Sequence, residues 1–191
     1  MLRSASERTR TLVEGPAIAV RVPKDDPFWE SFINRAPADP NNLIPHGFKQ
    51  VQPGGVNPVR TEVHSPNVMA THVKELAQFY GADLVGIVQM EDRRGIVCVM
   101  KTDYDTRSAL GIGGQTPALK GLFATFTVGA YIRELGYAAD ASEADRERCA
   151  AAAGLGVLDA EGRLVTRQFG TGVYVADVLL TDLPLEVDGR L

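Results

Sequence analysis

A lysine and a tyrosine follow an apolar run closely enough to share a proton-transfer role. They belong to the segment Lys101-Thr102-Asp103-Tyr104-Asp105, which comes directly after the β-prone residues 96–100. A phenol can act as a general acid, and a neighbouring cation such as Lys101 lowers the pKa of a tyrosine. The alternative is a tyrosine at a strand end, with its ring on the core and its hydroxyl in water. Tyr104 and Lys101 are therefore the candidate catalytic residues.

Other common catalytic motifs are missing from the sequence. It has no phosphate-binding Gly-x-x-x-x-Gly-Lys-Ser/Thr loop, no Gly-x-Ser-x-Gly elbow, no His-Glu-x-x-His and no Cys-x-x-Cys. Gly111-Ile112-Gly113 begins like a dinucleotide fingerprint, but Thr116 stands where the third glycine belongs. Cys98 and Cys149 are too few for a disulfide scaffold or a cysteine-only metal site. These patterns disfavour nucleotide binding and a zinc site.

Size and composition indicate a soluble globular protein. The chain has 191 residues, of which 45% are hydrophobic and 23% charged, and this fits one domain with its own core. Its net charge of −4 argues against a nucleic-acid partner or an anionic membrane surface. The sequence has neither a secretory signal nor a long apolar stretch, so we expect a cytoplasmic protein with no membrane span.

The elements that would position these residues are read from capping residues and apolar periodicity. Residues 1–66 are expected to form an N-terminal arm, with a short strand at 17–22, a short helix at 25–32 and a Pro/Gly-rich wrap. Residues 67–191 are expected to form the core of one compact domain. Its helices should begin at Asn67, at Thr116-Pro117 and at a Ser142/Asp145 capping box, and Gly111–Gly114 should form a loop. Strands are expected at 83–88, 96–100 and 172–180, with a turn at 93–95. The fold class is α+β, in layers.

Several segments in this order resemble one protein family. They are residues 73–87 (VKELAQFYGADLVGI), 131–139 (YIRELGYAA), 152–156 (AAGLG), 162–170 (GRLVTRQFG) and 181–186 (TDLPLE). Together they resemble the corrinoid-binding core of reductive dehalogenases and, more distantly, epoxyqueuosine reductase. The resemblance extends over about residues 67–188.

The resemblance implies a nitroreductase-like layered α+β fold that holds cobalamin. In such a protein the reduced cobalt attacks or coordinates the substrate, a tyrosine supplies a proton, and a basic residue assists. The residues expected to contact the cofactor are Tyr137, Leu155, Gly156, Arg163, Thr166, Phe169 and Gly170. Glycines between 156 and 170 would let the backbone approach a large flat ligand, and Phe169 and Tyr137 would either stack on it or belong to the core.

The departures from the family pattern concern electron supply and the basic residue. The family's cysteine-rich ferredoxin module has no counterpart in this sequence, and two cysteines cannot hold two iron–sulfur clusters. We therefore expect no iron–sulfur cluster and a separate electron-donor protein. Gly172 stands at the position of a family arginine, and Arg167, five residues earlier, is a speculative replacement.

Three functions remain open on the sequence. The first is a corrinoid-dependent reductase that acts on a small organic substrate, halogenated or not, with electrons from an external donor. The second is a corrinoid- or tetrapyrrole-binding or processing protein without dehalogenase activity. The third is a repurposed small-molecule-binding domain that has lost cobalamin. The oligomeric state is not determined by the sequence, and a homodimer is one option.

Overall fold

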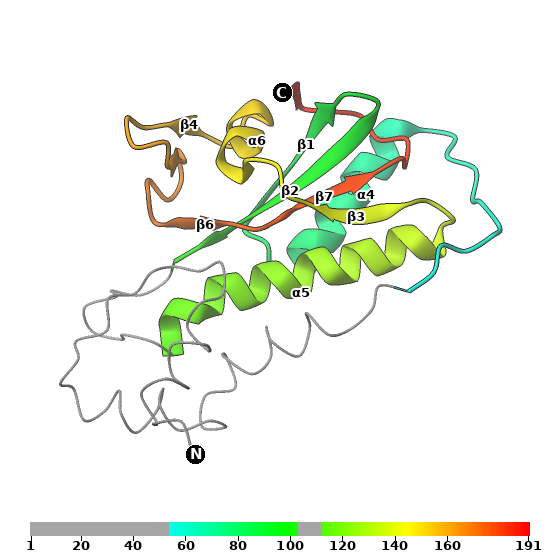
Figure 1. Ribbon diagram of the computed structural model, residues 1–191, viewed down its shortest axis with the longest axis horizontal. Helices are drawn as coiled ribbons and strands as arrows, with labels where there is room; N and C mark the ends of the chain where they lie inside the picture. The colour runs from blue at the N-terminus through cyan, green and yellow to red at the C-terminus, as the bar shows by residue number, and fades with distance from the viewer. Residues whose placement is uncertain (1–53, 103–111) are drawn as a thin grey trace, which may run out of the picture. The chain divides into compact units, whose positions relative to one another are not determined.

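The computed structural model describes residues 54–102 and 112–191 (Figure 1). The chain divides into two units, and residues 53–102 with 120–191 form the unit that contains the sheet. The other unit comprises residues 1–52 and 103–119. The strand and the helix expected at 17–22 and 25–32 lie outside the described residues. The division into an arm of residues 1–66 and a core of 67–191 stays a prediction.

A mixed β-sheet forms the centre of this unit. The strand order is β3-β7-β2-β1-β8, and β6 also pairs with β2. All pairs are antiparallel except β1 with β8. The strands are β1 (Leu84–Met90), β2 (Arg93–Lys101), β3 (Ala139–Ser142), β6 (Val173–Val175), β7 (Val178–Thr181) and β8 (Gly189–Arg190). The α+β class is confirmed, whereas a specifically nitroreductase-like layering stays a prediction.

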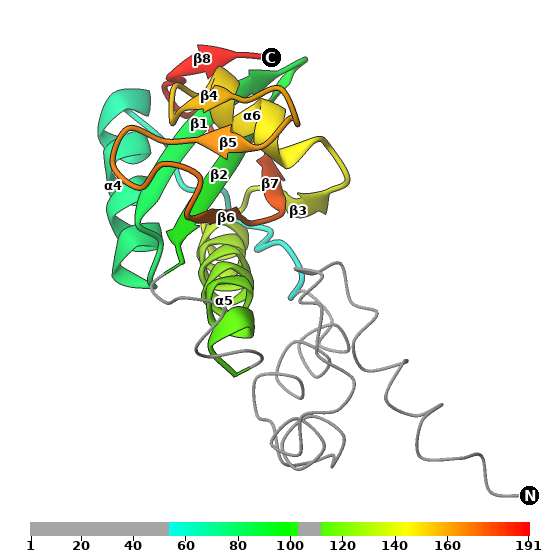
Figure 2. The ribbon, with the colours of Figure 1, turned by 90° about the vertical axis from the view of Figure 1, so that its left-hand side faces the viewer.

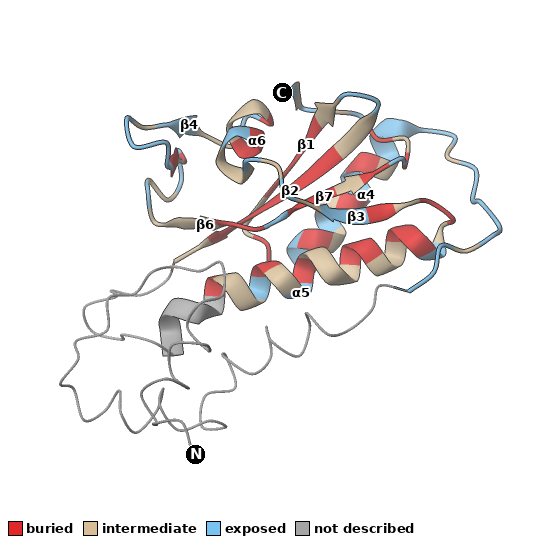
Figure 3. Cartoon of the chain, in the orientation of Figure 1, coloured by how far each residue is buried: buried red, intermediate tan, exposed pale blue. Residues whose placement is uncertain are grey.

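Helices cover both faces of the sheet (Figure 2). Helix α4 (Pro66–Phe79) and helix α5 (Ile112–Glu134) pack on one face, where Val73, Ile96 and Val128 are fully buried. The short helix α6 (Arg146–Ala152) packs on the other face, together with the hairpin of β4 (Val157–Leu158) and β5 (Leu164–Val165). Because strand side chains alternate between the faces, β2 contributes to both clusters. Figure 3 shows that most of β2 is buried.

The helix starts differ from the expected ones because the caps lie elsewhere. Ser65, not Asn67, caps α4: its hydroxyl accepts the amide of Val68 at 3.4 Å, and Pro66 occupies the first turn. Asp145 caps α6 by accepting the amide of Arg148 at 3.0 Å. Ser142, expected to open the capping box, ends β3 instead.

The start of α5 also corrects the sequence interpretation. The backbone is helical from Ile112, so the loop expected at Gly111–Gly114 is wrong for the described residues of that range. Pro117 lies inside the helix instead of at its first position. A proline near a helix start removes few hydrogen bonds, so it marks the start only approximately.

The strands correct two further expectations. The hairpin turn lies at Glu91 and Asp92, with Met90 paired to Arg93, and not at residues 93–95. Glu91 adopts a left-handed conformation with φ of 52°. The strand expected at 172–180 is interrupted between β6 and β7, where the amide of Ala176 donates to the carbonyl of Cys98 at 2.9 Å. No helix in residues 54–102 or 112–191 is long and apolar enough to cross a membrane.

Candidate functional site

The end of β2 meets the loop at residues 166–172, and this brings several predicted residues together. Lys101 pairs with Val173, and the amide of Thr102 donates to the carbonyl of Gly172 at 2.8 Å. The backbone amide of Lys101 also donates to the carboxylate of Asp83 at 2.8 Å. Alternation along β2 places Lys101 on the face that carries α6 and the β4–β5 hairpin. Lys101 and the loop thus share one end of the sheet.

The loop itself is a tight, hydrogen-bonded hairpin turn. Thr166 and Gly170 exchange both backbone hydrogen bonds at 2.9 Å, and the buried Thr166 hydroxyl accepts the amide of Phe169 at 3.0 Å. Gly170, which pairs with Thr166 to close the three-residue loop 167–169, has a φ of 56°, a left-handed backbone conformation that favours glycine. Nothing lies within 4 Å of where a Cβ at Gly170 would stand, while Phe169 is half-buried. The backbone at Gly170 is therefore open, and the Phe169 side chain is partly accessible.

The β4–β5 hairpin uses its polar residues internally. The carboxylate of Asp159 accepts the amides of Glu161 and Arg163, at 3.0 and 2.8 Å, and pairs with the Arg163 guanidinium at 2.8 Å. The backbone hydrogen bond from Arg163 is the main reason that the pKa of Asp159 lies below its usual value. Arg163 also pairs with Glu161 at 3.0 Å, and its own pKa is raised mainly by Asp159. Arg163 is exposed, and it stabilises the turn.

Leu155 and Gly156 connect α6 to this hairpin. Leu155 is half-buried and packs in the apolar cluster on the α6 face. A Cβ at Gly156 would stand 2.4 Å from the carbonyl oxygen of Val165. Close packing of β5 accounts for the glycine at position 156 without a ligand.

Tyr137 lies apart from the other predicted cofactor residues. It belongs to the core cluster on the α4 and α5 face, and its hydroxyl donates to the carbonyl of Thr61 at 2.7 Å. The Arg60 guanidinium stacks over its ring at 4.3 Å, and Arg60 also forms an ion pair with Asp182. Tyr137 therefore fastens residues 57–61 to the end of α5.

Tyr104 lies outside the described residues, but the structure contains another tyrosine near the end of β2. Tyr174 pairs with Met100, and the Arg146 guanidinium lies 3.4 Å from its hydroxyl. Burial raises the pKa of Tyr174 despite the opposing effect of Arg146, so the phenol keeps its proton. Arg146 also pairs with Asp177 at 3.3 Å. The long separation of Arg146 from Tyr174 explains why sequence spacing gave no signal for this pair.

The cysteines are both free and lie on opposite faces of the sheet. Cys98 is in the α4 and α5 cluster and Cys149 is in the α6 cluster. Burial raises the pKa of Cys98 to about 12 and also raises the pKa of Cys149, so both thiols stay protonated. Within the described part of the chain, no three His, Cys, Asp or Glu side chains are grouped to hold a metal ion.

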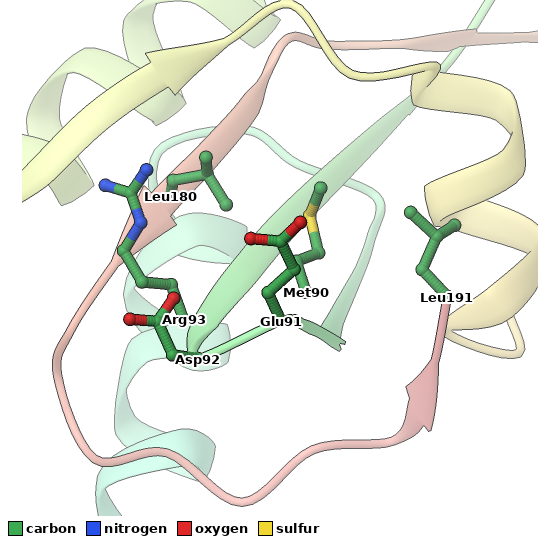
Figure 4. A pocket seen from close by; sticks show the side chains of 6 residues that line it. All are labelled: Met90, Glu91, Asp92, Arg93, Leu180 and Leu191. Atoms are coloured by element: carbon green, nitrogen blue, oxygen red, sulfur yellow. The ribbon is translucent and has the colours of Figure 1, made fainter.

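A pocket of about 350 Å³ lies at the β1–β2 turn, away from the end of β2 (Figure 4). Its lining is mixed, with apolar and charged side chains: Met90, Glu91, Asp92, Arg93, Leu180 and Leu191. None of the predicted site residues lines this pocket. Because β2 runs from Arg93 to Lys101, the pocket and the candidate site are at opposite ends of that strand.

Comparison with known proteins supports a fold relationship. No protein-family model matches the sequence, and no curated protein matches it. One match is a reductive dehalogenase structure, described as suggesting a mechanism for B12-dependent dehalogenation. Its TM-score is 0.68 and its sequence identity is 20%, and the match covers 79% of this chain and 24% of that one. The catabolic reductive dehalogenase NpRdhA matches with a TM-score of 0.66, 20% identity and the same coverages.

The same enzyme in complex with 3-bromo-4-hydroxybenzoic acid matches with a TM-score of 0.65 and 20% identity, covering 78% of this chain and 24% of that one. The chain thus spans about a quarter of the length of these structures. The described α+β unit has a fold like part of the reductive dehalogenases, to which it is distantly similar.

Proposed function

We propose that this chain is a corrinoid-dependent reductase core that acts on a small organic substrate. The observation that carries the proposal is the fold likeness to B12-dependent dehalogenases, at a TM-score of 0.68 over 79% of the chain. The sequence segments that resemble the corrinoid-binding core of that family point the same way. Lys101, Phe169 and Gly170 lie near the end of β2, and we propose that the cofactor binds there.

The residues at that end fit a large flat cofactor in part. The space beside Gly170 and the half-buried ring of Phe169 suit close backbone approach and stacking. Thr166 holds the turn in shape, and Arg163 stabilises the neighbouring β4–β5 hairpin. Tyr137 lies in the core on the opposite face of the sheet, away from these residues. When bound, a corrinoid supplies the reducible metal centre that the chain's own residues lack.

The chain's own part in catalysis is to orient the substrate and supply a proton. Tyr104 lies two residues beyond Thr102, whose amide is fixed by Gly172 at the end of β2. Lys101, next to Thr102, would favour the phenolate of Tyr104 after proton transfer. Electrons would come from a donor outside these residues, because both cysteines of the sequence are buried and lie on opposite faces of the sheet.

Titration with hydroxocobalamin tests the proposal, with matched variants to locate the site. The spectrum should shift to a base-off form as the corrinoid binds. Phe169→Ala should weaken binding about tenfold, the equivalent of about 1.4 kcal/mol from a lost stacking contact. Phe79→Ala is the control, because Phe79 is 81% exposed on α4, on the opposite face. Equal affinities of both variants would remove the assigned site.

One observation favours binding without dehalogenation as a second candidate. Gly172 stands where the family carries an arginine, and a Cβ there would lie 3.2 Å from the carbonyl oxygen of Phe169 and 3.3 Å from the hydroxyl of Thr102. The structure therefore leaves little room for a basic side chain at position 172. Reductant-dependent release of halide from a halogenated aromatic distinguishes the candidates. Turnover supports the reductase, and stable corrinoid binding without turnover supports the binding protein.

A further inference from the structure

Arg133, in the last turn of α5, is a buried cation without a buried anion. It is only 7% exposed, and one terminal nitrogen donates to the carbonyl of Ala139 at 2.7 Å. Its Nε is buried and has no hydrogen-bond partner. Among the described residues, no carboxylate forms an ion pair with it. A guanidinium has five N–H donors, and the buried Nε–H of Arg133 is one that finds no acceptor in the described residues.

The nearby acidic side chains are engaged elsewhere. Asp140, which follows Ala139, lies 3.8 Å from Arg93. Asp182 accepts the amide of Ala138 at 2.7 Å and pairs with Arg60. Leaving a buried N–H donor of a guanidinium without an acceptor is costly, and an anion bound beside Arg133 would supply that acceptor.

A second arginine, Arg94, lies in the row of paired strand residues that includes Ala139, the residue to which Arg133 donates. Arg94 on β2 pairs with Thr181 on β7, and Thr181 pairs in turn with Ala139 on β3. Paired residues share a face, and alternation from Ile96 places Arg94 on the face that carries α5. The Nε of Arg94 is also buried without a partner, while one terminal nitrogen donates to the carbonyl of Asp92 at 3.3 Å.

The packing around Arg133 leaves space for its guanidinium. A Cβ at Gly129, one turn earlier on α5, would stand 3.2 Å from one of its terminal nitrogens and 3.3 Å from a methyl carbon of Leu179. The guanidinium therefore lies against the helix backbone between α5 and β7. Its Nε is thus fixed on the same face of the sheet as that of Arg94.

We propose that Arg94 and Arg133 form an oxyanion-binding site between α5 and the β7–β3 edge of the sheet. The ligand class is a small carboxylate or phosphate, because both present paired oxygens that match the planar guanidinium edge. The site is on the face opposite to Lys101 and the β4–β5 hairpin, and it does not depend on corrinoid binding. The two proposals can therefore fail separately.

Thermal unfolding of the whole chain in the presence of anions tests this site. Sodium phosphate and sodium succinate are titrated separately against sodium chloride at constant ionic strength. We expect a saturable rise in Tm of about 3 °C with one of them, since a ligand that binds only the folded state stabilises it. The anion that saturates at the lower concentration identifies the source. No saturable rise with either anion would overturn the proposal.

Matched variants then assign the effect to the two arginines. Arg133→Met removes the buried charge and should abolish the anion-dependent rise while leaving the chain folded. Arg94→Gln should reduce the rise, and it serves as the second probe if Arg133→Met does not fold. Arg148→Gln is the control, because it makes the same charge change at an exposed position on α6. A full rise in both site variants would contradict the assignment.

Discussion

Asp159 shows how a single carboxylate stabilises part of the candidate site. It accepts two amides and a guanidinium within its own turn, and these contacts lower its pKa below the ordinary value of 3.8. A carboxyl whose pKa is lowered by folding stabilises the folded turn above its unfolded pKa. That contribution is lost as the pH falls through the lowered folded pKa.

We predict that acid releases this turn with a midpoint below pH 3.8. The amide proton shifts of Glu161 and Arg163, followed by NMR, should titrate together at that midpoint. Asp159→Asn should abolish the titration, because the amide side chain cannot ionise. A midpoint at or above the ordinary aspartate pKa would show that these hydrogen bonds do not favour the ionised carboxyl.

Single residues also show how far the sequence could locate the site. Lys101 and Phe169 come together because a β-ladder joins β2 to β6 next to the 166–170 turn, and that pairing is non-local. The family resemblance grouped Tyr137 with the cofactor residues, but its contacts Arg60 and Thr61 are 76 or more positions away in the chain, so sequence spacing could not show them as partners. Both Phe169 and Tyr137 are aromatic residues that were expected to stack on the cofactor. Only the tertiary contacts show that Tyr137 belongs to the core of the opposite face.

At the scale of elements, residues 57–61 form a strap over the end of α5. The amides of Asn57 and Thr61 donate to the carbonyls of Arg133 and Leu135, each at 2.9 Å. Carbonyls at a helix C-terminus lack partners within the helix, so the strap satisfies them. Gly136 has a φ of 85°, and its Cα faces the backbone of Arg60.

Gly136→Ala should destabilise the protein more than Gly162→Ala. Both glycines have positive φ, 85° and 77°, so both substitutions carry the same backbone strain of about 1 kcal/mol. Only at Gly136 would the new Cβ stand 2.6 Å from the Cα of Arg60, whereas nothing lies within 4 Å at Gly162. Urea unfolding of the two variants measures the difference, and equal free energies of unfolding would mean that the strap is not held against the helix end.

Element types were more predictable than their limits. The apolar periodicities predicted α4, α5 and the β1–β2 hairpin, because each buries a continuous stripe. The short strands β3, β4 and β5 were not predicted, since two to four residues carry no measurable period. The predicted cap positions were wrong where several residues near a helix start could each serve as the N-cap, as Ser65 and Asn67 could for α4.

At the scale of the whole molecule, the two proposed sites lie on opposite faces of one sheet. The α6 face and the end of β2 carry the proposed corrinoid contacts, and the α5 face carries the two arginines with unpartnered Nε groups. Since the neighbours of known structure are 20% identical, the likeness establishes the fold and leaves the chemistry to experiment.

The most direct test of the central claim is the amount of cobalt that stays with the protein. The chain is incubated with hydroxocobalamin and desalted, and its cobalt content is then measured against its protein concentration. We expect about one cobalt per chain, less in Phe169→Ala and the same amount in Phe79→Ala. A folded protein that retains no cobalt would contradict the proposal that this fold still holds a corrinoid.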